Sequence, residues 1–244
     1  MLSRDKAEVE NSYPELKGII SVNRNKSIAL HGPTWVSHYY VAQLRDLWRR
    51  FAWIIRSRNF PRTADGRLLL HIGCGDINAP GFINIDARYQ PHIHIVTSNL
   101  QSLDMVPDET ADMVYMCHVL EHVSHCELIT TVREIRRVLK RGGVYRVSVP
   151  DFDKIVSIYH NTGNDVTAVE RPLMGGQDYS FNYHYSVFNY RSLESLMLKN
   201  GFMDVRVWDP LNCHYHDFND WASQYIVWEG KEFPISLNLE AIKE

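Results

Sequence analysis

Two glycines and one acidic residue, set between two apolar runs, are the residues whose types and spacing suit ligand binding. The run Leu68–Leu70 with Ile72 is short enough to be a strand buried on both faces. Gly73-Cys74-Gly75 follows, where missing side chains let backbone N–H groups approach a ligand closely. A second run, Phe82–Ile85, ends at Asp86, whose carboxylate can accept both hydroxyls of a ribose. The pattern predicts an α/β fold that binds an adenosine-containing cofactor, although a tight turn in any α/β domain would look the same.

Composition places the chain among ordinary globular proteins. It has 244 residues, of which 45% are hydrophobic and 23% charged, enough for one large domain with its own core. A net charge of -3 argues against a general nucleic-acid binder. The four cysteines are scattered, without a disulfide framework, which favours a reducing compartment. The first residues lack the apolar segment of a signal peptide, and no apolar run reaches the ~20 residues that span a bilayer. We therefore expect a cytoplasmic protein with no nucleic-acid partner.

Residues 34–58 have the pattern of a basic amphipathic helix. One face carries the apolar residues Tyr40, Leu44, Leu47, Trp48, Phe51 and Ile55, and another carries Arg45, Arg49 and Arg56. Such a helix can lie on an anionic membrane surface. Amphipathic helices that pack on a sheet or on a second copy of the chain are far commoner, and we favour that interpretation. Its place before the first strand also suits a lid over a cofactor cleft. We treat residues 1–60 as an N-terminal extension, with a peripheral membrane contact and a homodimer as open alternatives.

Strand and helix patterns alternate between His92 and Asp151. The sequence predicts strands over 92–96, 113–117 and 143–149. Ser124 and Glu127 are spaced as a capping box, which opens a helix with an apolar stripe that Gly142 ends. Together with the first two strands, this alternation predicts a doubly wound, mostly parallel sheet. Such sheets bind ligands at the carboxyl ends of their strands.

Three segments in this order resemble the class I S-adenosylmethionine-dependent methyltransferases. They are residues 69–75, 113–122 and 138–143, and they cover roughly residues 66–150. A predicted helix over 191–200 and strand over 203–208 are similar to that family's last helix and antiparallel strands. The run Pro80–Asp86 is similar to a subset linked to surface-polysaccharide synthesis. The resemblance implies a Rossmann-like methyltransferase domain over residues 61–244, with antiparallel C-terminal strands and S-adenosylmethionine as its cofactor.

The resemblance also implies which residues contact the cofactor. They are His71, Gly73, Cys74, Gly75, Asp86, Ala87, Asn99, Leu100, Cys117 and His118. Asp86 lies only eleven residues beyond Gly75, so the family's first helix must be one turn or missing. Asn99 stands where the family has an acidic residue for the adenine amino group, and its amide oxygen can accept the same hydrogen bond. A nicotinamide-dependent oxidoreductase is the competing enzyme class, and the lack of Gly-x-Gly-x-x-Gly disfavours it.

Three residues are candidates for a catalytic base. Methyl transfer from a sulfonium is an in-line displacement, which needs positioning and, where the acceptor keeps its proton, a base. His122 follows the fourth strand and Asp151 follows the fifth. His184 lies in the segment from about 160 to 188, which is too long for a passive connector and is predicted to bind the acceptor. A structural cap bonded to backbone is an equal alternative for His122.

The acceptor is predicted from the aromatic residues of 175–185. Flat rings can pack on the apolar face of a sugar while Asn182 and His184 bond its hydroxyls. We predict O-methylation of a saccharide or glycan precursor. A small-metabolite acceptor, and a non-catalytic scaffold in glycan assembly, are the alternatives.

Two groups of residues have the types that bind metals. One is His122, His125 and Cys126, and the other is Cys213, His214 and His216. Neither repeats a C-x-x-C spacing, and adjacent residues in a helical turn point in different directions. The sequence therefore predicts no metal.

Overall fold

The computed structural model describes residue 44 and residues 47–244, and the compact unit that contains the sheet spans Arg45–Glu244. The predictions for residues 1–43 and 45–46 lie outside the described residues. Residues 47–56 are helical, as predicted, and the 3-10 turn η2 (Ser57–Asn59) follows them. No helix in the described part of the chain is long and apolar enough to cross a membrane.

The helical residues 47–56 bury a different face from the predicted one. Trp53 is their buried side chain, and its ring packs edge-on against Phe60 with centroids 5.4 Å apart. Four of the residues assigned to the packed face, Leu47, Trp48, Phe51 and Ile55, are exposed. Trp53 enters the core next to the sheet, whereas packing of the predicted face on a second copy of the chain stays a prediction.

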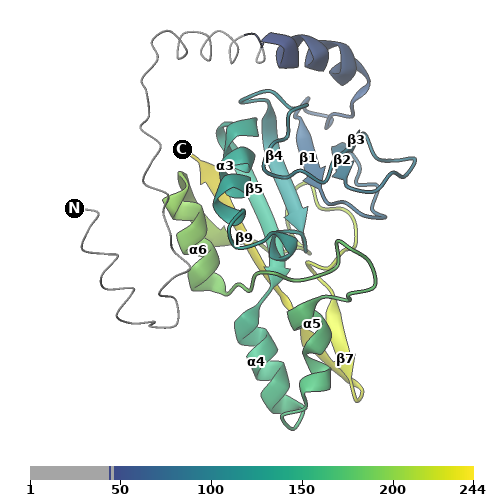
Figure 1. Cartoon of the computed structure of the whole chain (residues 1–244), viewed down its shortest axis with the longest axis vertical. Coiled ribbons are helices and arrows are strands. Elements are labelled where there is room, and N and C mark those ends of the chain that lie inside the picture. The colour runs from purple at the N-terminus through teal and green to yellow at the C-terminus, as the bar shows by residue number, and fades with distance from the viewer. Residues whose placement is uncertain (1–43, 45–46) are drawn as a thin grey trace, which may run out of the picture. The chain divides into compact units, whose positions relative to one another are not determined.

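A seven-stranded sheet has the order β3-β2-β1-β4-β5-β9-β6 (Figure 1). Its strands are β1 (Leu69–Ile72), β2 (Phe82–Asp86), β3 (Ile95–Val96), β4 (Ala111–Cys117), β5 (Leu139–Pro150), β6 (Phe202–Val207) and β9 (Ser236–Lys243). The pairs from β3 through β5 are parallel, whereas β9 runs antiparallel to both β5 and β6. This confirms the predicted mostly parallel sheet with antiparallel C-terminal strands. The predicted strand over 92–96 is reduced to its last two residues.

The two faces of the sheet are covered differently. Helices α3 (Leu128–Val138) and α6 (Tyr190–Lys199) cover one face, where Val132, Ile135 and Leu193 are completely buried (Figure 1). The irregular segment 208–224 packs on the other face, against Leu69, Phe82 and Tyr115. No helix joins β1 to β2 in the described structure, and residues 73–81 form turns instead. The prediction of a missing first helix is therefore confirmed.

Helix α3 begins and ends differently from the prediction. Ser124 and Glu127 bond each other through their side chains, and the helix starts at Leu128 without a side-chain cap. It ends at Val138, well before Gly142, and the chain passes directly into β5. The N–H of Thr110 donates to the carbonyl of Val138 at 2.8 Å, so a neighbouring loop satisfies the helix end.

A group of small elements lies beyond the carboxyl end of β5 (Figure 1). It comprises α4 (Phe152–Asn161), η4 (Val166–Ala168), α5 (Glu170–Met174) and the hairpin of β7 (Tyr225–Trp228) and β8 (Lys231–Pro234). Ile155, Ile158 and Ile235 are buried in their shared core. The segment from 160 to 188, predicted to be a long loop, is thus helical in its first half.

The glycine turn after β1 gives a test of the fold. Gly73 has φ +66°, and a Cβ there would lie 2.3 Å from Val119 Cγ2, whereas Gly142 has φ +72° with nothing within 4 Å. Gly142→Ala should lower the free energy of unfolding by about 1 kcal/mol, because only the left-handed conformation opposes an alanine there. Gly73→Ala should cost about 1–3 kcal/mol more through the added contact. Urea unfolding of both variants measures the difference, and equal losses would show that Val119 moves aside without cost.

Candidate active site

A cavity of about 860 Å³ opens at the carboxyl ends of four parallel strands. The last residue of each strand lines it: Ile72 of β1, Asp86 of β2, Cys117 of β4 and Pro150 of β5. This is where open parallel sheets bind ligands. Its volume is near the upper end of the range of about 300–1,000 Å³ for ligand pockets, so it can hold a cofactor and part of a second molecule.

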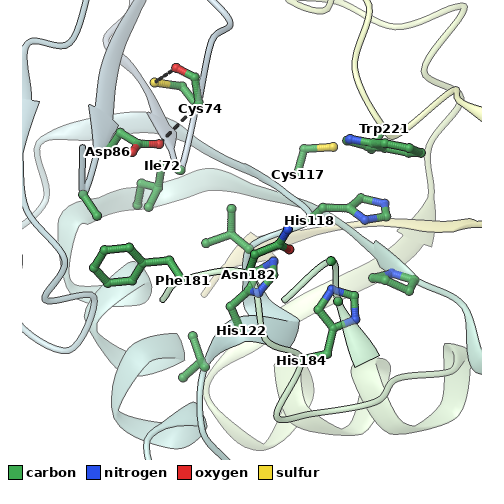
Figure 2. Close-up of a pocket in the computed structure, with 18 of the residues that line it drawn as sticks. Ile72, Cys74, Asp86, Cys117, His118, His122, Phe181, Asn182, His184 and Trp221 are labelled. Atoms are coloured by element: carbon green, nitrogen blue, oxygen red, sulfur yellow. Dashed lines mark hydrogen bonds between the residues drawn. The ribbon is translucent and has the colours of Figure 1, made fainter. Parts of the chain in front are cut away.

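The Asp86 carboxylate ties the glycine turn to the end of β2. Its Oδ2 accepts the Gly75 N–H at 2.9 Å, and its Oδ1 accepts the Arg88 N–H at 2.9 Å. The side chain of Arg88 adds an ion pair, with Nε 3.6 Å from Oδ1. Each carboxylate oxygen keeps a further lone pair, so Asp86 can still accept two ribose hydroxyls. Figure 2 shows Cys74 and Asp86 together at one side of the cavity.

Nine of the ten predicted cofactor residues line the cavity. They are His71, Gly73, Cys74, Gly75, Asp86, Ala87, Leu100, Cys117 and His118. Asn99 is the exception, because its Oδ1 accepts the backbone N–H groups of Gln101 and Ser102 at 3.1 and 3.2 Å. Its side chain therefore closes a turn and borders a separate small pocket. Sequence reasoning missed Thr97 and Ser98, which follow β3 and do line the cavity.

His118, His122 and His184 line the opposite part of the cavity, and with the buried Glu121 they form a group that we call the Glu121 cluster. The first three follow β4 through the 3-10 turn η3 (Leu120–His122), and His184 follows α5. Figure 2 shows the three histidines gathered away from Asp86. The rings of His122 and His184 have centroids 4.8 Å apart. The structure thus brings together two of the three predicted bases.

Backbone carbonyls fix the ring orientation of two of these histidines. His122 Nδ1 lies 3.0 Å from the carbonyl oxygen of Tyr183, and His184 Nδ1 lies 3.1 Å from that of Pro172. A carbonyl only accepts, so both Nδ1 atoms carry the hydrogen in these bonds. The Nε2 atom of each neutral ring therefore carries a lone pair.

Glu121 is buried without a hydrogen bond within the described structure. Its side chain is 1% exposed, and neither carboxyl oxygen has a hydrogen-bond partner. His118 Nδ1 is 3.3 Å from Oε1, and His184 Nε2 is 4.0 Å from it. Burial raises the pKa of Glu121 to about 8. Burial also lowers the pKa of His118 to about 3 and that of His184 to about 4. At neutral pH the cluster is therefore largely uncharged.

The third predicted base, Asp151, has a structural role. Its Oδ1 accepts the Asp153 N–H at 3.1 Å and so caps α4, and its Oδ2 lies 4.0 Å from Lys154 Nζ. Asp151 is not among the residues that line the cavity. The Asp151 carboxylate is thus engaged at the start of α4 and away from the cavity.

The segment 175–185 closes over the cavity from the side of α5. The Arg88 guanidinium lies over the Tyr179 ring, 5.0 Å from its centroid, and joins this segment to the cofactor end. A Cβ on Gly175 would lie 2.5 Å from the Asn182 carbonyl oxygen, so this close fold requires glycine. Several large aromatic side chains with substantial exposure line the cavity: Tyr179, Phe181, Tyr185, Trp221 and Tyr225.

Comparison with known proteins adds a family assignment for part of the chain. Residues 68–147 match the family model described as a methyltransferase domain. No curated protein matches the chain.

Similar solved structures include two S-adenosylmethionine-dependent methyltransferases. One is from Archaeoglobus fulgidus (17% identity, 82% of this chain and 94% of that chain, TM-score 0.46). The other is from Methanosarcina mazei (18% identity, 72% of this chain and 92% of that chain, TM-score 0.45). A third is the 1,6-didemethyltoxoflavin-N1-methyltransferase of Burkholderia thailandensis with bound 1,6-didemethyltoxoflavin and S-adenosylhomocysteine (17% identity, 89% of this chain and 93% of that chain, TM-score 0.45). At TM-scores below 0.5, these likenesses carry no argument about function.

Glu121→Gln tests the electrostatics of the cluster. The pKa of Glu121 is about 8 in the folded protein, against an ordinary 4.5, so between these values the folded state keeps a proton that the unfolded state has lost. Rising pH should therefore destabilise the wild type relative to the neutral, isosteric Gln variant, by up to about 1.4 kcal/mol per pH unit. Urea unfolding from pH 5 to 8, with chelator present, measures it, and Glu229→Gln on an exposed turn is the control. A difference that stays constant with pH would contradict a protonated Glu121.

Proposed function

We propose that this protein, whose residues 68–147 match a methyltransferase-domain family model, uses S-adenosylmethionine to methylate a hydroxyl group of a saccharide or glycan precursor in the cytoplasm. The observation that carries the proposal is the cavity that joins Asp86 at one end to the three histidines of the Glu121 cluster and the aromatic residues at the other. A cofactor and an acceptor bound in the same cavity can meet without a rearrangement of the sheet. The four cysteines are free, in keeping with a reducing compartment.

The residues at the Asp86 end fit S-adenosylmethionine. The spare lone pairs of the carboxylate suit the ribose hydroxyls. Gly75 leaves the backbone open toward the cavity, because a Cβ there would have only the Arg88 guanidinium within 4 Å, at 3.6 Å. Thr97 and Ser98 flank the cavity beyond β3, where we place the adenine. When bound, S-adenosylmethionine supplies an electrophilic methyl group on a sulfonium sulfur.

The chain's own residues position the acceptor and act on its proton. His122 and His184 line the cavity, and their Nδ1–H groups are held by the carbonyls of Tyr183 and Pro172. Their Nε2 atoms are thus set in place to act on an acceptor hydroxyl. The contact of Tyr179 with Arg88 keeps the segment 175–185 over the cofactor end, which limits the access of water.

The aromatic residues favour a saccharide. Phe181 is 48% exposed, Tyr185 is 60% exposed and Trp221 is 51% exposed, although all three line the cavity. Covering large apolar rings that are exposed to water is favourable, because it removes apolar surface from water. The apolar face of a sugar ring can cover them while the sugar hydroxyls stay hydrated or hydrogen-bonded. A planar small metabolite would use the same rings.

One observation supports a non-catalytic scaffold as the second candidate. The described glycine turn is followed by no helix, so no helix N-terminus faces the cofactor's carboxylate, and Asn99 is used in a turn. A protein that kept the fold without binding the cofactor would have these features.

Partners beyond the acceptor are proposed from the helical residues 47–56. Leu47, Trp48, Phe51, Ile54 and Ile55 are exposed there. They support a contact with a second copy of the chain or with a membrane surface, and light scattering with and without anionic vesicles would tell these apart. Residues 61–244 remain our proposal for the catalytic domain, with residues 1–60 as an N-terminal extension.

Calorimetry with S-adenosylhomocysteine tests the cofactor assignment. Asp86→Ala should weaken binding about 10–100-fold, the loss expected for hydrogen bonds to a charged group. Asp217→Ala, on the exposed surface outside the cavity lining, should leave it unchanged. Tighter binding of a nicotinamide dinucleotide, or no binding of either, would overturn the assignment, and the second outcome would favour the scaffold.

Turnover against a panel of saccharide precursors and small hydroxylated metabolites tests the acceptor class. With a saccharide, Phe181→Ala should raise KM about 2–10-fold through lost ring stacking, with S-adenosylhomocysteine affinity unchanged. Tyr89→Ala removes an aromatic ring that is 79% exposed and lies outside the cavity lining, and it should change neither value. Methylation of the small metabolites alone would show that the saccharide assignment is wrong.

A further inference from the structure

Three side chains of the Glu121 cluster direct ligand atoms at one place. One ligand atom from each of Glu121, His122 and His184 lies within 4.8 Å of the others. The residues come from two separate segments, η3 and the chain after α5. A cation between these atoms would contact all three after small side-chain movements.

The orientation of both imidazoles is that of metal ligands. The Nδ1–H groups of His122 and His184 are donated to the carbonyls of Tyr183 and Pro172. The Nε2 atom of each ring is left with a lone pair, and that of His184 lies 4.0 Å from Glu121 Oε1. Histidines that bind metals almost always donate their other ring N–H to a carbonyl or carboxylate in this way.

Glu121 supplies a second, independent observation. Its two oxygens are buried and have no hydrogen bond within the described structure, a costly arrangement for a carboxyl group. The nearest nitrogen is His118 Nδ1, at 3.3 Å from Oε1.

That neighbouring nitrogen is itself an acceptor. Ser236 donates its O–H to the carbonyl of Trp221, so its Oγ must accept from His118 Nε2, at 2.8 Å. His118 Nδ1 of the neutral ring is then left with a lone pair. Neither His118 Nδ1 nor His184 Nε2 therefore directs an N–H group at the Glu121 carboxyl.

We propose that Glu121, His122 and His184 bind one divalent transition-metal ion, of which Zn²⁺ is the test case. Two imidazoles and one carboxylate are a common ligand set of catalytic zinc and other transition-metal sites. Mg²⁺ and Ca²⁺ prefer sites made of oxygen atoms alone. His122 and His184 both line the cavity, so the coordination positions that the protein leaves open face the acceptor.

The metal's role rests on the proposed function, whereas its binding does not. An acceptor hydroxyl that occupies an open position has its pKa lowered by the ion, and its proton leaves to solvent. The oxygen then forms the bond to the methyl carbon, while the carbon–sulfur bond breaks and its electron pair stays on sulfur. The two Nε2 atoms act through the metal in this account. Acceptors with two neighbouring oxygen atoms, such as vicinal sugar hydroxyls, suit two open positions.

Zinc titration of the chelator-treated full chain by calorimetry tests the proposal. Wild type should bind one equivalent, and His122→Ala and His184→Ala should each weaken binding by at least about 100-fold, since the loss of outer partners alone costs 10–100-fold. His125→Ala removes an exposed histidine three residues from His122 that is not part of the ligand set, and it should bind like wild type. Mg²⁺ should not compete.

Two further measurements keep the outcomes separate. Thermal melts establish that each variant is folded. S-adenosylhomocysteine binding, measured on the same samples, reports the cofactor end independently of the metal. Zinc binding that survives both histidine substitutions, or its absence from a wild type that binds S-adenosylhomocysteine, would overturn the metal site and leave the proposed function standing. Zinc binding without S-adenosylhomocysteine binding would leave the metal site and contradict the proposed function.

Discussion

The parallel register of β1 between β2 and β4 is the constraint on which the site depends. Ile72 pairs with Ile85 on one side and with Met116 on the other, so the residues that follow all three strands emerge at one edge. Strands β1 and β2 are buried along their whole length, and a slip of one residue would turn every side chain to the other face. The glycine turn, Asp86 and the Glu121 cluster are therefore placed by the same packed core.

The second face of the sheet is covered by an irregular segment, where the first face is covered by helices α3 and α6. The irregular segment 208–224 covers it with rings and paired polar groups. Tyr115 donates its hydroxyl to Asp220, and the buried pair of Arg146 and Glu240 has an N–O distance of 2.8 Å, with the guanidinium 4.9 Å from the Trp208 ring centroid. Buried polar groups need such partners. Five buried side-chain polar atoms of the described residues lack a hydrogen-bond partner, and two of these are the oxygens of the single residue Glu121.

The sequence predicts the core of the fold well because short apolar runs and glycine turns are local signals. The strands at Leu69 and Ala111 and the short or missing first helix follow from such patterns, whereas the nine predicted cofactor residues that line the cavity came from the family resemblance. Asn99 could not be placed, because an asparagine after a strand can either face a ligand or close a turn, and the backbone geometry decides.

Tertiary contacts account for the rest. The end of α3 depends on the N–H of Thr110, a loop residue that donates to the Val138 carbonyl and that no helical pattern in the sequence marks. The Glu121 cluster brings His184 beside His122 across 62 positions, so spacing alone gave no reason to expect metal ligands there. Glu121 itself was overlooked because a glutamate before a histidine in a short turn is ordinarily a solvated residue.

A crystal structure with S-adenosylhomocysteine bound tests the account most directly. The account predicts the ribose hydroxyls on the Asp86 carboxylate, with the sulfur directed along the cavity toward His122 and His184. Adenosine bound at the Glu121 cluster, or a sulfur that faces away from both histidines, would contradict it.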